Sequence, residues 1–259
     1  MISLIKIKNR KAQSHIEVII SFVIFITFLI FIFTLFNPLK KQVNSEFADS
    51  VFVKIKENTS TVLSSFSINL KTTTMNDPVK GFTSWTCIMI PPIDGFDCGS
   101  SKKLIVKRAD DIIVPGFVDT SDGNKIKFEH EKDLTKTFYT FYCGENLTEN
   151  HGTFDKSKCM ELTKNINYTL GIVVSRDLFS EDNLNKFKEI YDNDYSDIKN
   201  EFVPSGNDFG ILVFDESGIF LNVTKKIPRG INIDSQITPI DLVNKNAEIK
   251  KATVNVLVW

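Results

Sequence analysis

The sequence has almost no net charge and few of the residues on which catalytic sites depend. It contains 31 Lys and Arg against 32 Asp and Glu, and this balance gives no electrostatic reason to expect nucleic-acid binding. Histidine is scarce, with only His15, His130 and His151, and no G-x-S-x-G, H-E-x-x-H or P-loop pattern is present. We therefore expect neither enzymatic activity nor a cofactor.

Metal-binding patterns are missing as well. No two cysteines have the close spacing of a zinc site. Asp192, Asp194 and Asp197 stand near one another as calcium ligands do, but Asp197 occupies the place where an EF-hand loop needs glycine. Because these carboxylates also fall within a helical pattern, we interpret them as a solvated acidic helix face and expect no metal site.

Long hydrophobic runs are few, and the clearest extends from Val18 to Phe36. Its roughly 19 residues would cover about 28 Å as a helix, close to the hydrocarbon thickness of a bilayer. Basic residues are more frequent before the run than after it, which favours a cytoplasmic N-terminus. We predict a basic cytoplasmic leader over residues 1–12 and a hydrophobic transmembrane helix over 13–41. A cleavable secretory signal is the rival interpretation, although its apolar region is normally shorter, about 7–15 residues.

Cysteine is also rare, with Cys87, Cys98, Cys143 and Cys159. An even number on the outer side of a membrane suggests two disulfides. Three connectivities are open, and we predict the pairing of neighbours in the sequence, Cys87 with Cys98 and Cys143 with Cys159. Four free buried thiols remain an alternative.

Candidate glycosylation sites are present as Asn-x-Ser/Thr sequons. They begin at Asn58, Asn146, Asn167 and Asn222. About three such sequons are expected from the composition alone, so the motifs are compatible with glycosylation without demonstrating it.

Apolar residues recur at helical spacing beyond Pro38. They are Val43, Phe47, Val51, Ile55, Val62 and Phe66. This spacing predicts that the helix continues as an amphipathic extension over residues 42–70 and packs its apolar stripe on the head.

The remaining residues, 71–259, have the pattern of a β-rich extracytoplasmic head. Short apolar runs predict strands, and Asp122-Gly123 and Glu216-Ser217-Gly218 predict hairpin turns. One surface helix is predicted after Ser180, a suitable N-cap, with Leu184 and Phe187 on its apolar face. The expected fold class is α+β: a long N-terminal transmembrane and amphipathic helix, an antiparallel β-sheet head and one surface helix.

Glu17 lies directly before the hydrophobic run. Burying a carboxylate in lipid is costly unless it is paired. The alternative is that Glu17 lies in the membrane interface, solvated and without a role.

With Gln13 four residues before Glu17, this segment resembles an archaeal type IV pilin-like protein with a class III signal peptide. The resemblance covers roughly the first 36 residues. It implies cleavage between Ala12 and Gln13 by a prepilin peptidase on the cytoplasmic face. It also implies that the new amine of Gln13 pairs with the Glu17 carboxylate of a neighbouring subunit, which would neutralise two charges inside an apolar core.

The resemblance leads to a functional hypothesis. The chain would be a single-pass membrane protein with an extracellular head and a subunit of a type IV pilus-like filament or related assembly. Its partners would be the membrane, the prepilin peptidase and other pilin-like subunits. The large head, Pro38 and the pair Lys40-Lys41 depart from the pattern and favour a minor or tip subunit. The alternative is a membrane-tethered binding or adhesion module that does not polymerise, and an ectoenzyme ranks third.

Overall fold

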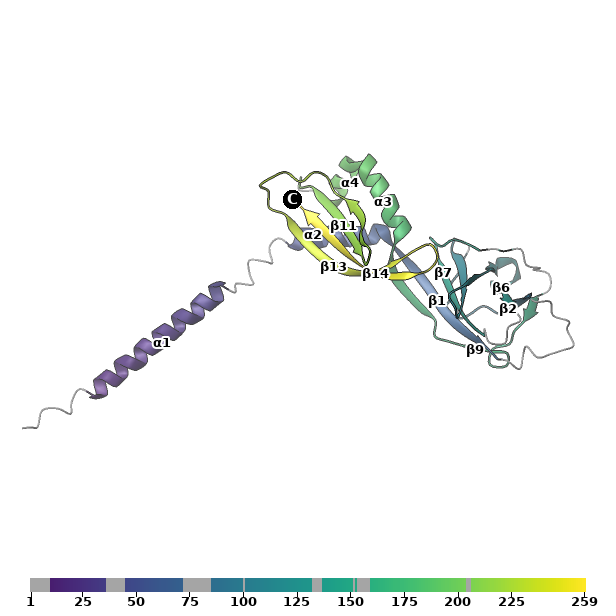
Figure 1. The fold of residues 1–259 in the computed structure, drawn as a ribbon, viewed down its shortest axis with the longest axis horizontal. Helices are drawn as coiled ribbons and strands as arrows, with labels where there is room; N and C mark the ends of the chain where they lie inside the picture. Colours follow the sequence, from purple (N-terminus) through teal and green to yellow (C-terminus); the bar gives the residue numbers. More distant parts are fainter. Residues whose placement is uncertain are drawn as a thin grey trace, which may run out of the picture. The chain divides into compact units, whose positions relative to one another are not determined.

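The chain forms two compact units in a computed structural model, Met1–Glu46 and Phe47–Trp259. Strands hold more residues than helices, so the structure is β-rich (Figure 1). The expected α+β class is therefore wrong, and the elements behind the difference are identified below. The structure describes residues 10–35, 45–71, 85–99, 101–131, 137–150, 152, 159–203 and 206–259.

The first unit contains one long helix, α1 (Arg10–Leu35). Residues 36–44 lie outside the described part, and so does the end of the transmembrane helix predicted over 13–41. Within the described residues, no helix has the combination of length and hydropathy that crossing a membrane requires. The predicted transmembrane helix is thus not found.

The second unit begins with a short helix that passes straight into a strand. Helix α2 (Ser45–Thr59) is followed at once by β1 (Ser60–Leu70), so the amphipathic helix predicted over residues 42–70 is wrong in its second half. From Ser64 to Leu70 the burial of side chains mostly alternates, with Phe66 and Ile68 buried. Alternation with a period of two is the signature of a strand, and it overrides the helical spacing of a few apolar positions.

Two sheets form the body of the second unit. The large sheet has the order β12-β11-β14-β13-β10-β1-β7-β3-β4, with β9 also paired to β1, and the small sheet has the order β5-β6-β2-β8. The strands after β1 are β2 (Trp85–Ile90), β3 (Lys103–Arg108), β4 (Ile113–Val114), β5 (Gly116–Asp119), β6 (Lys125–Glu131), β7 (Phe138–Gly144), β8 (Cys159–Glu161), β9 (Tyr168–Leu170), β10 (Val174–Ser180), β11 (Phe209–Asp215), β12 (Gly218–Val223), β13 (Asp234–Val243) and β14 (Ile249–Val258).

The sheets are mixed, whereas a purely antiparallel sheet was predicted. Strand β10 runs parallel to β13, and β2 runs parallel to β8. The predicted hairpins are confirmed: Gly123 adopts φ 66° between β5 and β6, and Glu216 and Ser217 connect β11 to β12. Hairpin turns are local and can be predicted from short motifs. A parallel pairing joins segments that are far apart in the sequence, so short motifs do not predict it.

The predicted surface helix is present but divided. Helix α3 (Glu181–Asn193) starts at its predicted cap, because the Ser180 side chain accepts a hydrogen bond from the N–H of Asn183. Asp194 then leaves the helical conformation, with φ −126° and ψ 41°, and α4 (Tyr195–Phe202) follows. Short polar side chains such as Asn193 and Asp194 favour such breaks, since they compete for backbone hydrogen bonds. Two surface helices therefore replace the one expected.

The predicted apolar face of these helices is confirmed. It packs with α2 on one face of strands β11 to β14 (Figure 1). The buried residues include Ala48, Val51, Ile55, Leu184, Phe187, Tyr191, Ile198, Phe202, Ile211, Val213, Val254 and Val256. Burial of this apolar area is the main stabilising contribution in this part of the unit.

A second hydrophobic cluster lies between the two sheets. The ring of Phe141 on β7 stacks on Phe66 of β1 with centroids 4.6 Å apart and meets Phe128 of β6 edge-on at 5.2 Å. Ile88 and Ile90 of β2 complete the facing layer. This cluster fixes the small sheet to the β1-β7-β3 part of the large one.

Candidate functional site

The three residues of the predicted processing and assembly site lie in one continuous helix. Ala12, Gln13 and Glu17 all belong to α1. Residues four apart lie on the same face of a helix, one turn from each other, so Gln13 and Glu17 share a face. The side chains before Glu17 lie outside the described part, and that of Glu17 is exposed.

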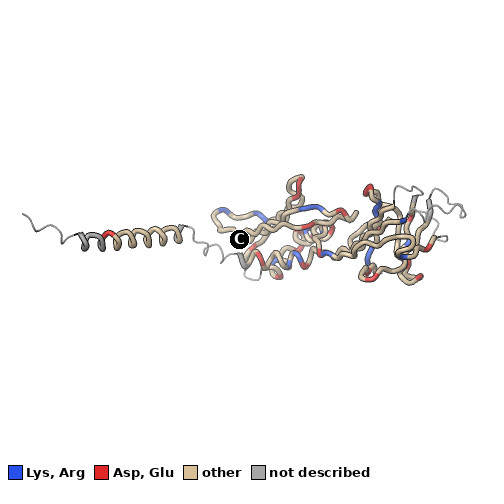
Figure 2. Tube along the Cα trace, turned by 90° about the horizontal axis from the view of Figure 1, so that it is seen from below, with Lys and Arg blue, Asp and Glu red and all other residues tan. Residues whose placement is uncertain are grey.

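The apolar surface of α1 is exposed over most of its described length. The side chains of Phe22 and Phe33 are 63% and 70% exposed, and residues 18–33 contain no charged side chain, as the tan colour in Figure 2 shows. Soluble monomers rarely expose apolar patches of more than a few hundred Å². The exposed apolar surface of α1 is therefore unusual for a soluble monomer.

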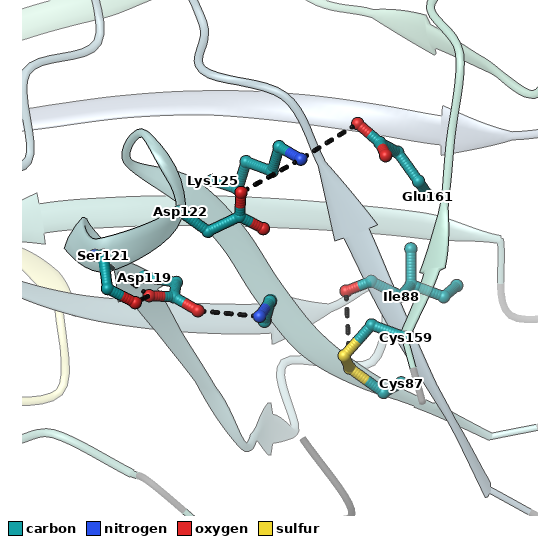
Figure 3. Close-up of polar contacts among 9 residues, drawn as sticks. Cys87, Ile88, Asp119, Ser121, Asp122, Lys125, Cys159 and Glu161 are labelled. Carbon is teal, nitrogen blue, oxygen red and sulfur yellow. Dashed lines mark hydrogen bonds and ion pairs between the residues drawn. A yellow bond between two sulfur atoms is a disulfide. The ribbon is translucent and has the colours of Figure 1, made fainter. Parts of the chain in front are cut away.

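All four cysteines form disulfides, as expected, but the predicted pairing is wrong. Cys87 is bonded to Cys159 and Cys98 to Cys143. The parallel pairing of β2 with β8 places Cys87 opposite Cys159, with their Cα atoms 4.5 Å apart (Figure 3). Proximity in the sequence gives no information about this register.

The second disulfide depends on an antiparallel pairing. Leu104 of β3 lies opposite Cys143 of β7, and Cys98 lies in the segment that leads into β3. Both disulfides thus join segments brought together by sheet formation. Disulfides persist in oxidising environments, so the second unit belongs in an extracellular type of environment.

Ion pairs lie on the same small sheet as the first disulfide (Figure 3). The Lys125 ammonium lies 3.3 Å from Asp122 and 3.4 Å from Glu161, and it thereby links the β5–β6 turn to β8. Asp119 accepts hydrogen bonds from Lys127 and Ser121, which lower the pKa of its carboxyl to about 2. These contacts stabilise the turn and the edge strand.

Two sequons differ sharply in their surroundings. The amide of Asn146 is half-buried and donates to Ser180 Oγ at 3.2 Å and to Asn183 Oδ1 at 2.9 Å. Asn222 is exposed on β12, and its Oδ1 accepts a hydrogen bond from Thr224, the hydroxyl residue of its own sequon, at 2.7 Å. Asn222 is therefore accessible, whereas hydrogen bonds within the fold hold the amide of Asn146.

The other two sequons are intermediate cases. Asn58 is exposed on α2, where its amide donates to the carbonyl of Lys54 at 2.9 Å. Asn167 is half-buried, and its Oδ1 accepts from the N–H of Thr163 at 2.8 Å.

Sequence reasoning missed a cavity on the large sheet. It has a volume of about 570 Å³ and is lined from β11, β13 and β14, with Phe214 and Pro239 as apolar residues and Asp215, Glu216 and Asp241 as acidic ones. The Glu216-Ser217-Gly218 turn was a signal in the sequence that fell in this region. The size of this cavity is within the range of ligand sites.

Among the described residues, no group of three or more His, Cys, Asp or Glu side chains is placed to share a metal ion. Asp192, Asp194 and Asp197 are all exposed, and Asp192 pairs with Lys188. The His130 ring is buried and contacts the hydroxyl of Tyr139, whereas His151 lies outside the described part.

Comparisons with known proteins place the chain in no group. No protein-family model, curated protein or solved structure matches it.

Proposed function

We propose that this protein is a pilin-like subunit, minor or at the tip, of a type IV pilus-like surface filament or related assembly. The observation that carries the proposal is the joint position of Gln13 and Glu17 on one face of α1, directly before the exposed apolar side chains of the same helix. In this proposal α1 attaches the protein to the membrane before assembly, with its N-terminus in the cytoplasm and the second unit outside.

The proposal explains why a carboxylate stands at the start of an apolar helix. A charge in an apolar environment is costly unless a counter-charge accompanies it. Cleavage between Ala12 and Gln13 by a prepilin peptidase would create an amine, which the Glu17 carboxylate of a neighbouring subunit would neutralise. The exposed side chains of α1 would then be covered by the equivalent helices of other subunits.

The test is the substitution Glu17→Gln, with Glu57→Gln as the matched control. Glu57 is exposed on α2, so its replacement removes a carboxylate without touching α1. Breaking a buried ion pair costs about 3–5 kcal/mol, which is more than a hundredfold in the equilibrium constant of each contact. We expect Glu17→Gln to remain in the membrane fraction and to disappear from sheared filaments, and Glu57→Gln to behave as the wild type.

Two results would contradict the proposal. One is incorporation of Glu17→Gln into filaments at the wild-type level. The other is a wild-type protein that is neither cleaved before Gln13 nor recovered in filaments, which would favour the membrane-tethered binding module.

A further inference from the structure

The cavity on the large sheet has an acidic rim. Its rim carries the carboxylates of Asp215, Glu216 and Asp241 against the single ammonium of Lys251, which is 2.5 Å from Asp241. Asp215 accepts hydrogen bonds from the N–H and the hydroxyl of Ser217, and these lower its pKa, so it is charged at neutral pH. Lys250 lies close enough to Asp215 to contribute to this lowering, and its ammonium is 3.7 Å from Glu181. The rim therefore retains an excess of negative charge.

The cavity opens on the face of the sheet that the helices leave free. Ala252 and Val254 of β14 belong to the cluster beneath the helices. Successive side chains of a strand point to opposite faces, so Lys251 and Thr253 point to the other face. The cavity lining contains these two residues together with Phe214 and Pro239.

A loop of opposite charge connects β12 to β13. It contains Lys225, Lys226 and Arg229 within the sequence KKIPRGINI, and Lys226 and Arg229 are exposed. Ile231 and Ile233 of the same loop are 47% and 45% exposed. The loop thus combines positive charge with apolar side chains, which complements the acidic and apolar lining of the cavity.

The two surfaces lie at opposite ends of the same strands. Asp215 ends β11, and Gly218 opposite it begins β12. Val223 at the far end of β12 lies opposite Ile211, so the loop that follows is beside the start of β11 at Phe209. The six residue steps from Phe209 to Asp215 along β11 correspond to about 20 Å. This distance separates the loop from the cavity of its own chain.

We infer that the β12–β13 loop of one copy docks on the acidic cavity of a second copy. This inference rests on the proposed function, because it names a contact between neighbouring subunits. Charge complementarity and matching apolar surface identify the occupant as a second copy. A contact between two different surfaces is heterologous, and repeated contacts of this kind build rings where the rotation closes and open-ended filaments where it does not.

Cross-linking with a carbodiimide tests the contact directly in the full-length protein. The reagent joins an amine to a carboxylate only where the two touch. We expect a cross-link from Lys226 to Glu216 or Asp215 in membranes or filaments, identified by mass spectrometry. Such a link cannot form within one chain across about 20 Å. Mixing isotope-labelled and unlabelled protein should yield cross-linked peptides of mixed label.

The Asp241–Lys251 pair provides an internal control, because its groups touch within one chain. If this intramolecular cross-link forms in assembled protein while no link from Lys226 to the cavity is found, the inference is overturned.

Charge reversal supplies a second measurement. Arg229→Glu, or Glu216→Lys, should remove most of the link from Lys226 to Asp215, because each substitution brings like charges together while the reacting amine and carboxylate remain. Combining Arg229→Glu with Glu216→Lys should restore that link, whereas failure of the combination to restore it would overturn the inference. Lys186→Glu, which reverses an exposed cation on α3, should leave the link unchanged.

The test separates this contact from the filament hypothesis. Glu17→Gln protein concentrated in detergent lacks the α1 contact, yet it should still form the Lys226 cross-link. If wild-type protein forms the link but never forms filaments, the proposed function fails and the contact stands. If filaments form without the link, the contact fails and the proposed function stands.

Discussion

At the scale of single residues, identical motifs have different chemistry because their surroundings differ. Asn146 and Asn222 both begin sequons, but the amide of Asn146 is held by Ser180 and Asn183 near the cap of α3, whereas Asn222 is exposed. A glycosyl transfer needs a free amide nitrogen and space for a bulky sugar.

We predict that Asn222 is modified in preference to Asn146 where the cell attaches N-linked sugars. Asn222→Gln should remove a glycan and lower the mass of the protein, whereas Asn146→Gln should leave the mass of the glycans unchanged and destabilise the fold through the lost hydrogen bonds. Glycopeptide mass spectrometry of both variants is the measurement, and a glycan on Asn146 would contradict the prediction.

At the scale of elements, the helix cap and the turn motifs predicted the structure correctly, whereas helical spacing alone misassigned β1 and the pairings between distant strands were not predicted. The N-cap of α3, its apolar face and the turn at Asp122-Gly123 depend on residues a few positions apart, and all three were correctly predicted. Strand β1 was mistaken for helix, because Phe66 and Val62 fit helical spacing while its partners, β7 and β10, lie far away in the sequence. The cavity escaped prediction for the same reason, since it combines β11, β13 and β14.

The packing of α3 gives a prediction about stability. Phe187 is 5% exposed and contacts the rings of Tyr191 and Phe202. Phe187→Ala should lower the free energy of unfolding by about 3–5 kcal/mol, because a buried ring is replaced by a cavity. Ile190→Ala is the matched control in the same helix, since Ile190 is 50% exposed and should cost much less. Urea denaturation of both variants measures the difference, and equal costs would show that the α3 face is not buried.

At the scale of the whole second unit, the disulfides close large loops. Cys87–Cys159 spans 72 residues in sequence and Cys98–Cys143 spans 45. Cross-links over long segments reduce the entropy of the unfolded chain more than short ones do. The pairing of neighbouring cysteines would have closed much shorter loops, and the sequence alone could not decide between them because strand register determines which cysteines meet.

Removal of either disulfide should therefore be costly. We expect Cys87→Ser with Cys159→Ser to lower stability by about 2–5 kcal/mol, and Cys98→Ser with Cys143→Ser to act similarly. Thermal unfolding under non-reducing conditions measures both. Non-reducing peptide mapping provides the control, and recovery of a Cys87–Cys98 peptide would show that the pairing differs from the structure.

The direct passage from α2 into β1 has a mechanical consequence. Thr59, the last residue of α2, is buried and its hydroxyl donates to the carbonyl of Ile55, and Ser60 already pairs with Phe179 of β10. No connecting residues lie between α2 and β1. A pulling force that enters through α2 is thus delivered to a strand held by β10 along one part of its length and by β7 along another. Under such a load β1 cannot separate from its neighbours until several of its hydrogen bonds to β7 and β10 break together. The connection between α2 and the sheet therefore stays stiff until the force is high enough to break these bonds.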